Sequence, residues 1–405
     1  MTKLDEKRVF ELAHQRAVEC GIDFKTLTQA IDGATLATDR TGEIPDSFWT
    51  QFDVRPLNLN WVPDAYSSRP TVHSALGRAA MVEELGYADP GYAISMPGPG
   101  LSMPPLAALG NPEQQSLHFG RFDSDIPRWG AFAITEPSVG SDATAIHTSA
   151  RKTTGGYVLN GQKCFITNGA RADYVIVFAN IARDRGRFGI RAFLVERGTA
   201  GFSVDRVEDM LGLRGSMLTA LSFEDCRVPE ENLLWGAHVG RHLDAFAAAQ
   251  GAWDFMRPML SCIIVGFCRR TRDLIAQYIA GGGPDGRPDW GQARVERYLA
   301  DMDREIMTAR LLAWQAAWKY EQGEAMSRDA SMAKAYASRL AQQLVEKAMD
   351  VLGMAAFEPS SRLEKAWRDA KAFDILEGTG DMQRQMIASL HRRERTSRQI
   401  QLRAA

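Results

Sequence analysis

Short runs of β-branched and aromatic residues form one block in the middle of the chain, and this block constrains the fold more than any other feature. The runs occupy 131–135, 157–161, 174–178 and 190–195, and Gly, Asn and Asp residues bound them. Runs of this length and composition are typical of strands separated by turns. A block of about 100 residues of this kind predicts a small sheet or barrel.

Helical periodicity replaces this pattern on both sides of the block. Apolar residues recur every three to four positions in 76–85, 295–309 and 332–344. Each such helix has an apolar stripe to bury, and an antiparallel bundle buries several stripes at once. Because 405 residues exceed the usual size of one core, more than one domain is expected. We therefore predict an α+β multidomain protein, with an N-terminal helical domain over 1–130, a middle β-barrel or sheet domain over 131–236 and a C-terminal four-helix bundle over 237–405.

The charge balance excludes partners that need a strongly basic surface. Forty-eight Lys and Arg against 50 Asp and Glu give a formal net charge of −2, so no general attraction to nucleic acid is expected. The five cysteines are scattered without a CxxC pair, which indicates neither a disulfide framework nor a zinc site. The chain begins as a charged amphipathic helix, and no apolar run approaches the roughly 18 residues of a membrane span. We therefore expect a cytoplasmic protein without membrane insertion.

Several weaker motifs indicate no site. Gly98-x-Gly100 and the glycine-rich stretch 281–286 do not lie between a predicted strand and a predicted helix, as a phosphate-binding loop requires. His238 and His242 have helical spacing, but no third ligand lies near them in the sequence, so we expect no metal site. The chain also lacks GxSxG and GxxxxGK[ST], which removes the usual support for a hydrolase or a nucleoside triphosphatase.

Two polar motifs come from the β block. Residues 134–142 read ITEPSVGSD, and residues 160–169 read NGQKCFITNG. Both are strand edges rich in hydroxyl and turn residues, which offer backbone N–H groups and short side-chain donors to a planar heterocycle or a phosphate. Either segment alone would be interpreted as an ordinary polar turn.

A third motif places a carboxylate among apolar neighbours. Residues 373–384 read FDILEGTGDMQR, with Glu377 between Leu376 and Gly378. Burial raises a carboxyl pKa from about 4.3 toward about 6 to 7, where a general base works best. Gly378 lets another molecule approach the backbone closely. Taken alone, a glutamate just before a helix is more often a cap.

The three motifs, in this order and at this spacing, resemble the acyl-CoA dehydrogenase family over most of the chain. The segments LSFEDCRVPEENLL at 221–234 and EKAWRDAKAF at 364–373 resemble that family too. The resemblance implies an FAD-dependent enzyme that removes a proton and a hydride from neighbouring carbons of an acyl thioester. It also implies an electron-transferring flavoprotein or an equivalent acceptor, and assembly as a homodimer or homotetramer.

The resemblance also implies a set of cofactor-binding residues. At the flavin ring these are Phe132, Ile134, Thr135, Phe165, Ile166 and Thr167. At the diphosphate and adenosine they are Ser141, Gly353, Thr379 and Asp381. Thr135 would hydrogen-bond the edge of the ring, and Phe165 stands where the family commonly has tryptophan.

Catalysis and substrate binding are assigned by the same resemblance. Glu377 is the base that takes the α-proton, and its own backbone N–H helps to polarise the thioester carbonyl. Four residues match family positions that bind the substrate or hold the catalytic base in place: Ser141, Asp254, Arg257 and Gly378.

Two segments depart from the family pattern. The family usually has an Arg-x-Phe-Gly stretch that reaches the neighbouring subunit's FAD, whereas residues 281–292 read GGGPDGRPDWGQ. It also has a Gln-x-Leu-Gly-Gly-x-Gly run for the diphosphate, whereas residues 350–356 read DVLGMAA and keep only one of the three glycines, Gly353. The departures leave three explanations: FAD held in a changed way, assembly with a different and complementary subunit, or a rebuilt dimer interface.

Alternative functions therefore remain at this point. One is a flavin oxidase or monooxygenase on the same architecture, and another is a non-catalytic partner subunit of a hetero-oligomeric dehydrogenase. The acyl chain cannot be read from the residues, and neither can the choice between a CoA and a carrier-protein thioester.

Overall fold

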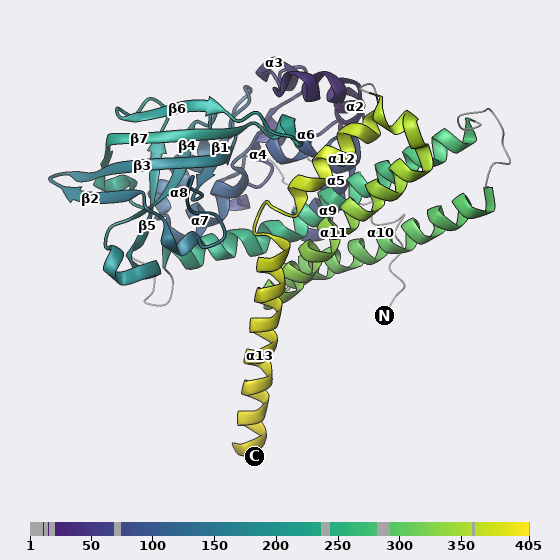
Figure 1. Cartoon of the computed structure of the whole chain (residues 1–405). Coiled ribbons are helices and arrows are strands. Elements are labelled where there is room, and N and C mark those ends of the chain that lie inside the picture. The colour runs from purple at the N-terminus through teal and green to yellow at the C-terminus, as the bar shows by residue number, and fades with distance from the viewer. Residues whose placement is uncertain are drawn as a thin grey trace.

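The computed structural model describes residues 11, 15, 21–68, 74–235, 244–281, 292–358 and 361–404, without the side chains of 292–294 and 397–404. His238, His242 and the loop beyond Gly281 up to residue 291 lie outside the described residues. A helical part, a sheet part and a second helical part follow one another along the chain, which confirms the predicted arrangement (Figure 1).

Short helices form the first part. They are α2 (Phe24–Thr41), α3 (Asp46–Trp49), α4 (Arg55–Leu59), α5 (Ala75–Ala88), α6 (Pro90–Ser95), α7 (Met103–Leu109) and α8 (Pro112–Gly120). Their ends follow local sequence signals. The Ser74 side chain accepts a hydrogen bond from Gly77 N at the start of α5, and Asn111 and Gln114 form a capping box at the start of α8.

The middle part is one curled seven-stranded sheet (Figure 1). Its strands are β1 (Gly130–Ala133), β2 (Ser149–Thr153), β3 (Gly156–Thr167), β4 (Tyr174–Asn180), β5 (Ile190–Glu196), β6 (Phe202–Val207) and β7 (Leu218–Pro229). The order is β1-β4-β2-β3-β7-β6, with β5 also paired to β4; β1 runs parallel to β4, and β3 runs antiparallel to β7. Every residue of β4 is buried, which explains its continuous apolar sequence.

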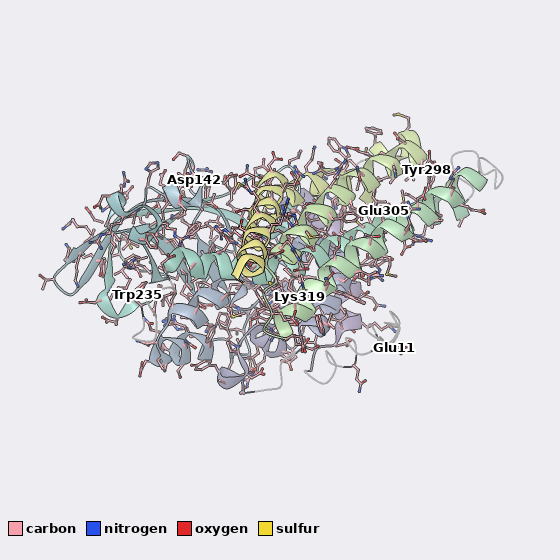
Figure 2. The ribbon with its side chains drawn as sticks, turned by 90° about the horizontal axis from the view of Figure 1, so that it is seen from below. Glu11, Asp142, Trp235, Tyr298, Glu305 and Lys319 are labelled. Atoms are coloured by element: carbon pink, nitrogen blue, oxygen red, sulfur yellow. The ribbon has the colours of Figure 1, made fainter. Side chains whose placement is uncertain are left out.

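Long helices form the last part: α9 (Ala245–Ala280), α10 (Gln292–Glu321), α11 (Ser327–Leu352), α12 (Arg362–Phe373) and α13 (Gly380–Ala404). Helices α9, α10 and α11 pack against one another, and Tyr298, Glu305 and Lys319 mark successive positions along α10 (Figure 2). Helix α13 begins beside α11 and then extends beyond the other helices (Figure 1). No helix within the described residues combines the length and the apolar character needed to cross a bilayer.

The apolar stripes predicted for α10 and α11 agree with the observed burial to different degrees. On α10, Val295, Met302, Ile306 and Ala309 are buried, as predicted. On α11 the prediction that every fourth residue from Met332 is buried was partly wrong, because Met332 is 38% exposed. Small residues form most of the buried face of α11 instead: Ala330, Ser331, Ala333, Ala337, Ser338 and Ala341.

Helices α5 and α9 cross in unusually close contact. A Cβ atom at Gly86 would lie 2.2 Å from Ile263 O, and one at Gly266 would lie 1.9 Å from Glu83 O. Because real Cβ atoms do not approach so closely, the glycines allow the first helical part to dock on the second. This docking places the long helix α9 between the N-terminal helices and the rest of the bundle.

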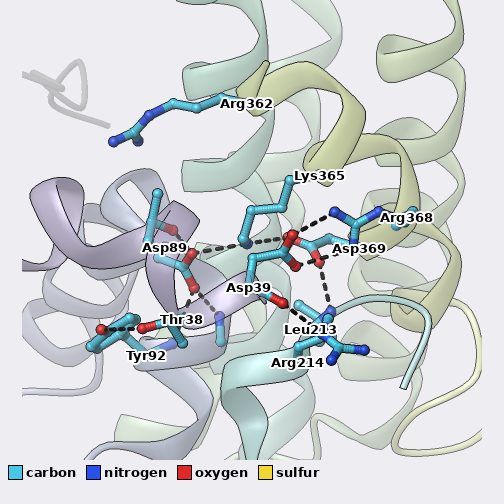
Figure 3. Close-up of polar contacts among 12 residues, drawn as sticks. Thr38, Asp39, Asp89, Tyr92, Leu213, Arg214, Arg362, Lys365, Arg368 and Asp369 are labelled. Atoms are coloured by element: carbon cyan, nitrogen blue, oxygen red, sulfur yellow. Dashed lines mark hydrogen bonds and ion pairs between the residues drawn. The ribbon is translucent and has the colours of Figure 1, made fainter. Parts of the chain in front are cut away.

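A buried ionic network also joins the separate parts of the chain (Figure 3). Lys365 Nζ on α12 lies 2.9 Å from Asp89 Oδ2 and 2.6 Å from Asp369 Oδ2. Asp369 Oδ1 in turn accepts a hydrogen bond of 2.6 Å from Leu213 N, in the loop before β7. Arg368 forms an ion pair with Asp39 on α2. The network therefore fixes α12 relative to both the first helices and the sheet domain.

Candidate active site

Glu377 lies in the short turn between α12 and α13, and the backbone of this turn is left-handed. The φ angles are 55° at Glu377 and 91° at Gly378. A non-glycine residue in this region costs on the order of 1 to 2 kcal/mol, so surrounding contacts must hold it there. Within the turn, Ile375 N and Leu376 N donate to Ala372 O, and Gly380 N donates to Asp374 O. None of these bonds uses the Glu377 N–H.

Buried donors from other helices hold the carbonyl groups of the turn. Arg257 Nε on α9 donates to Glu377 O at 3.3 Å, and Gln383 Nε2 on α13 donates to the same oxygen at 3.0 Å. Gln383 Nε2 also reaches Gly378 O at 3.1 Å. Lys334 Nζ on α11 donates to Gly378 O at 2.7 Å and to Asp374 O at 3.1 Å. Three helices therefore fix the turn from different directions.

The surroundings of the Glu377 carboxyl group give it a pKa that suits a general base. Its Oε2 atom is buried and has no hydrogen-bond partner. Desolvation raises the carboxyl pKa to about 7, while the positive charges of Arg257 and Lys334 act in the opposite direction. A carboxyl group with this pKa is ionised about half of the time near neutral pH, which suits proton abstraction.

Helix α9 connects this turn to the sheet domain. Asp254 Oδ1 lies 2.7 Å from Arg257 Nη1, so the arginine that binds Glu377 O is itself held by a carboxylate. The neighbouring residue Trp253 packs against Phe132 of β1, with ring centroids 6.2 Å apart. The predicted positions Asp254 and Arg257 thus lie together beside Glu377, and the same turn of α9 reaches β1, the strand that leads into the first β motif.

The two β motifs lie side by side. Cys164 N donates to Thr135 O at 3.0 Å, and the buried Lys163 Nζ donates to Ile134 O at 2.9 Å. Lys163 Nζ also lies 2.8 Å from Glu136 Oε1, so the buried ammonium group has a carboxylate partner. These contacts hold the 134–135 and 164–167 segments against each other.

The exposed side chains of the two motifs suit a planar heterocycle. Phe165 is 52% exposed, with a left-handed φ of 57°, and Thr135 and Thr167 are half-buried. An aromatic ring beside hydroxyl groups offers both a stacking face and hydrogen-bond donors. In contrast, Phe132, Ile134 and Ile166 are buried, so their side chains support the motif from inside the core. The residues at this end fit the flavin ring of FAD.

Some of the predicted cofactor residues do not join this group. Gly353 is exposed at the far end of α11, and a helical rise of about 1.5 Å per residue places it roughly 28 Å from Lys334. Ser141 and Asp381 are exposed, and Asp381 Oδ1 lies 2.7 Å from Arg384 Nη2. Thr379 Oγ1 accepts a hydrogen bond of 3.3 Å from Met382 N at the start of α13. The roles of these four residues stay predictions.

Sequence reasoning missed two residues that hold the Glu377 turn. Lys334 and Gln383 are 0% and 1% exposed and donate to its carbonyl groups. Lys334 occupies a buried face made mostly of alanine and serine, and a charged residue at such a position is the signal that would have found it. Gln383 lies in the third motif itself, but its sequence neighbours give no sign that its side chain turns back toward Glu377.

Comparisons with known proteins agree with this geometry. Residues 131–226 match the acyl-CoA dehydrogenase middle domain, and residues 246–390 match the acyl-CoA dehydrogenase C-terminal domain. The chain is 38% identical over 284 residues to an acyl-CoA dehydrogenase of Bacillus subtilis (strain 168), covering 70% of this chain and 73% of that protein.

Solved structures give the same result. Butyryl-CoA dehydrogenase from Megasphaera elsdenii superposes with a TM-score of 0.84 at 28% identity, covering 96% of this chain and 99% of that one. A structure named for the electron transferring flavoprotein of Acidaminococcus fermentans superposes with a TM-score of 0.82 at 28% identity, covering 96% and 98%. The chain therefore belongs to the acyl-CoA dehydrogenase family, FAD-dependent oxidoreductases that act on CH–CH groups.

Proposed function

We propose that this protein introduces a double bond between the α and β carbons of an acyl thioester, with Glu377 as the base. The observation that supports this most is the buried Oε2 atom of Glu377, which has no hydrogen-bond partner and belongs to a carboxyl group with a pKa of about 7. A buried and unpartnered carboxylate is costly for stability, so a function in proton transfer gives it a reason.

Glu377 and the residues around it have different roles in the proposed reaction. The Glu377 carboxylate accepts the α-proton, and the Glu377 N–H donates to the thioester carbonyl as negative charge grows on that oxygen. One such donor contributes on the order of 3 kcal/mol to the transition state. Arg257 and Gln383 keep the turn in place through hydrogen bonds to the Glu377 carbonyl oxygen. FAD, when bound, supplies the acceptor for the β-hydride, which no protein side chain can accept.

Several predicted features extend this proposal. We propose an electron-transferring flavoprotein as the partner that reoxidises the flavin, and the second structural relative described above supports this choice. Acyl-CoA is the preferred thioester, because the curated relatives are named for CoA substrates. Assembly as a homodimer or homotetramer and a cytoplasmic location stay predictions.

We expect an acyl thioester to bleach the flavin of the purified holoenzyme under anaerobic conditions. Absorbance of the oxidised flavin, followed against a panel of acyl-CoA and acyl-carrier-protein thioesters, measures the reaction and ranks the substrates. Rapid oxygen consumption without another acceptor would instead indicate an oxidase. A purified protein that binds no flavin and reacts with no thioester would identify a non-catalytic partner subunit.

The rate of flavin reduction should depend on pH through the Glu377 carboxyl group. The base must be ionised to accept a proton, and its pKa is about 7. The rate at saturating substrate is therefore expected to be highest above pH 7 and to fall about tenfold for each unit below it. Stopped-flow measurement of flavin reduction across this range tests the prediction, and a rate that is flat from pH 5 to pH 8 would contradict it.

A further inference from the structure

Lys334 is a fully buried cation whose hydrogen-bond partners are neutral. Its side chain is 0% exposed, and Nζ donates to Asp374 O at 3.1 Å and to Gly378 O at 2.7 Å. These two carbonyl groups lie on either side of Glu377 in the sequence. Removing an ammonium group from water is unfavourable, and carbonyl dipoles offset this less well than a directly bound carboxylate does. The buried Lys163, which bonds directly to Glu136, shows the more usual arrangement.

A neutral donor also holds the same turn. Gln383 donates to Glu377 O and to Gly378 O, so both carbonyl groups of the left-handed residues have an uncharged donor as well as a charged one. A lysine adds what an amide cannot, namely a positive charge in a region of low dielectric constant beside the base. The Glu377 Oε2 atom has no hydrogen-bond partner, so this charge acts on the carboxylate through space.

Building on the function proposed for Glu377, we propose that Lys334 is a positioning residue for the base. Its ammonium group holds both ends of the turn and supplies a positive charge that stabilises the ionised carboxylate before substrate is attacked. Arg257, which is paired with Asp254, acts in the same direction and lowers the carboxyl pKa more strongly than Lys334 does.

The electrostatics of the surrounding helices agree with this role. Desolvation lowers the pKa of Lys334 to about 8, while Asp374 and Glu377 act to raise it. The lysine and the glutamate therefore titrate close together and behave as a coupled pair. Above pH 8 the neutral amine keeps two N–H donors for its two carbonyl partners, so the charge is lost and the turn is retained. The other charged groups that act on this pair are Asp374 in the turn, Arg257 on α9 and Arg384 on α13. Asp254 is paired with Arg257, and the exposed Asp381 is paired with Arg384.

Two substitutions separate the charge from the hydrogen bonds. Lys334→Met removes both, whereas Gln383→Leu removes only neutral hydrogen bonds to the same turn. The Glu377 carboxyl group is titrated by infrared spectroscopy, through the carbonyl stretch of its protonated form, which is assigned by its loss in Glu377→Gln. This measurement reports on the protein itself and does not depend on turnover. The pH profile of flavin reduction by an acyl-CoA is then recorded for each holoenzyme.

We expect Lys334→Met to raise the pKa of Glu377 by about one unit, a shift typical of losing one nearby opposite charge. The ionised fraction of the base at pH 6, and with it the rate of flavin reduction, then falls by about tenfold beyond any loss seen at high pH. Gln383→Leu is expected to lower the rate at every pH without moving the pKa. An unchanged titration in Lys334→Met, or an equal shift in Gln383→Leu, would overturn the proposal.

Stability is the competing explanation for a buried lysine. Lys334→Gln, which keeps a neutral donor, is therefore measured beside Lys334→Met and should show the same upward shift. If neither variant folds while Gln383→Leu does, Lys334 serves stability alone and the proposal fails. Full activity of Glu377→Gln would remove the proposed function itself, whereas an inactive Glu377→Gln with an unmoved titration in Lys334→Met removes only the role of Lys334.

Discussion

Glu377→Gln is expected to lower the rate of flavin reduction by acyl thioesters by about 10²- to 10⁴-fold, the usual contribution of a positioned general base. The amide has nearly the shape of the carboxylate but cannot accept the α-proton. The backbone contacts of the turn go through carbonyl groups rather than this side chain, so the variant retains the turn. Anaerobic stopped-flow absorbance of the bound flavin measures the rate.

Stability provides the control for this variant. The native pKa of Glu377 is raised to about 7 from the ordinary 4.5, so the native state binds the proton more tightly than the unfolded chain does. Above pH 7 the buried charge therefore opposes folding, and replacing it with a neutral amide should not lower the melting temperature at pH 8. A variant that keeps normal turnover would remove Glu377 from the mechanism, and one that unfolds at pH 8 would show that the carboxylate stabilises the turn.

Glu83→Leu is expected to lower the free energy of unfolding by about 3 to 5 kcal/mol, because it removes the carboxylate that pairs with the buried guanidinium group of Arg310. Glu83 is 0% exposed on α5, and its Oε1 atom lies 2.8 Å from Arg310 Nη2 on α10 and 3.0 Å from Arg269 Nη1 on α9. Arg310 is only 3% exposed. Urea unfolding, followed by circular dichroism, measures the loss.

An exposed ion pair offers a matched control. Lys152 Nζ lies 3.0 Å from Glu230 Oε1, with the two side chains 63% and 56% exposed. Lys152→Met removes one partner of a pair of similar length, and we expect a much smaller loss than in Glu83→Leu because solvent screens the exposed charges. An equal decrease in the free energy of unfolding in both variants would show that burial does not determine how much the Glu83 ion pair contributes to stability.

The order of helical and sheet parts could be predicted from the sequence because periodicity reports burial directly. The fully buried β4 and the stripe of α10 are strong signals of this kind. Strand β6 was not predicted, since most of its residues are exposed and it lacks an apolar alternation. The stripe of α11 was only partly predicted: Leu340 and Leu344 are buried, but alanine and serine, which carry little hydrophobic signal, form much of the rest of its buried face.

The candidate site was predictable only where chemistry and local sequence coincide. Glu377 stands in a distinctive motif with apolar neighbours, so both its position and the direction of its pKa shift follow from the sequence. The supports of the turn come from α9, α11 and α13, and contacts between helices far apart in the chain cannot be read from spacing. Gly353 was expected at the FAD diphosphate rather than at the base, and its role stays a prediction.

The ionic network around Lys365 affects the order in which parts of the enzyme fold. Leu213 N and Asp369 are separated by 156 positions, and Arg368 and Asp39 by 329, yet these contacts anchor the helix that leads directly into the Glu377 turn. Closing such large loops is slow and comes late in folding. A nascent chain thus acquires its acid–base chemistry only after α12 has been synthesised and has docked on helices made more than 300 residues earlier.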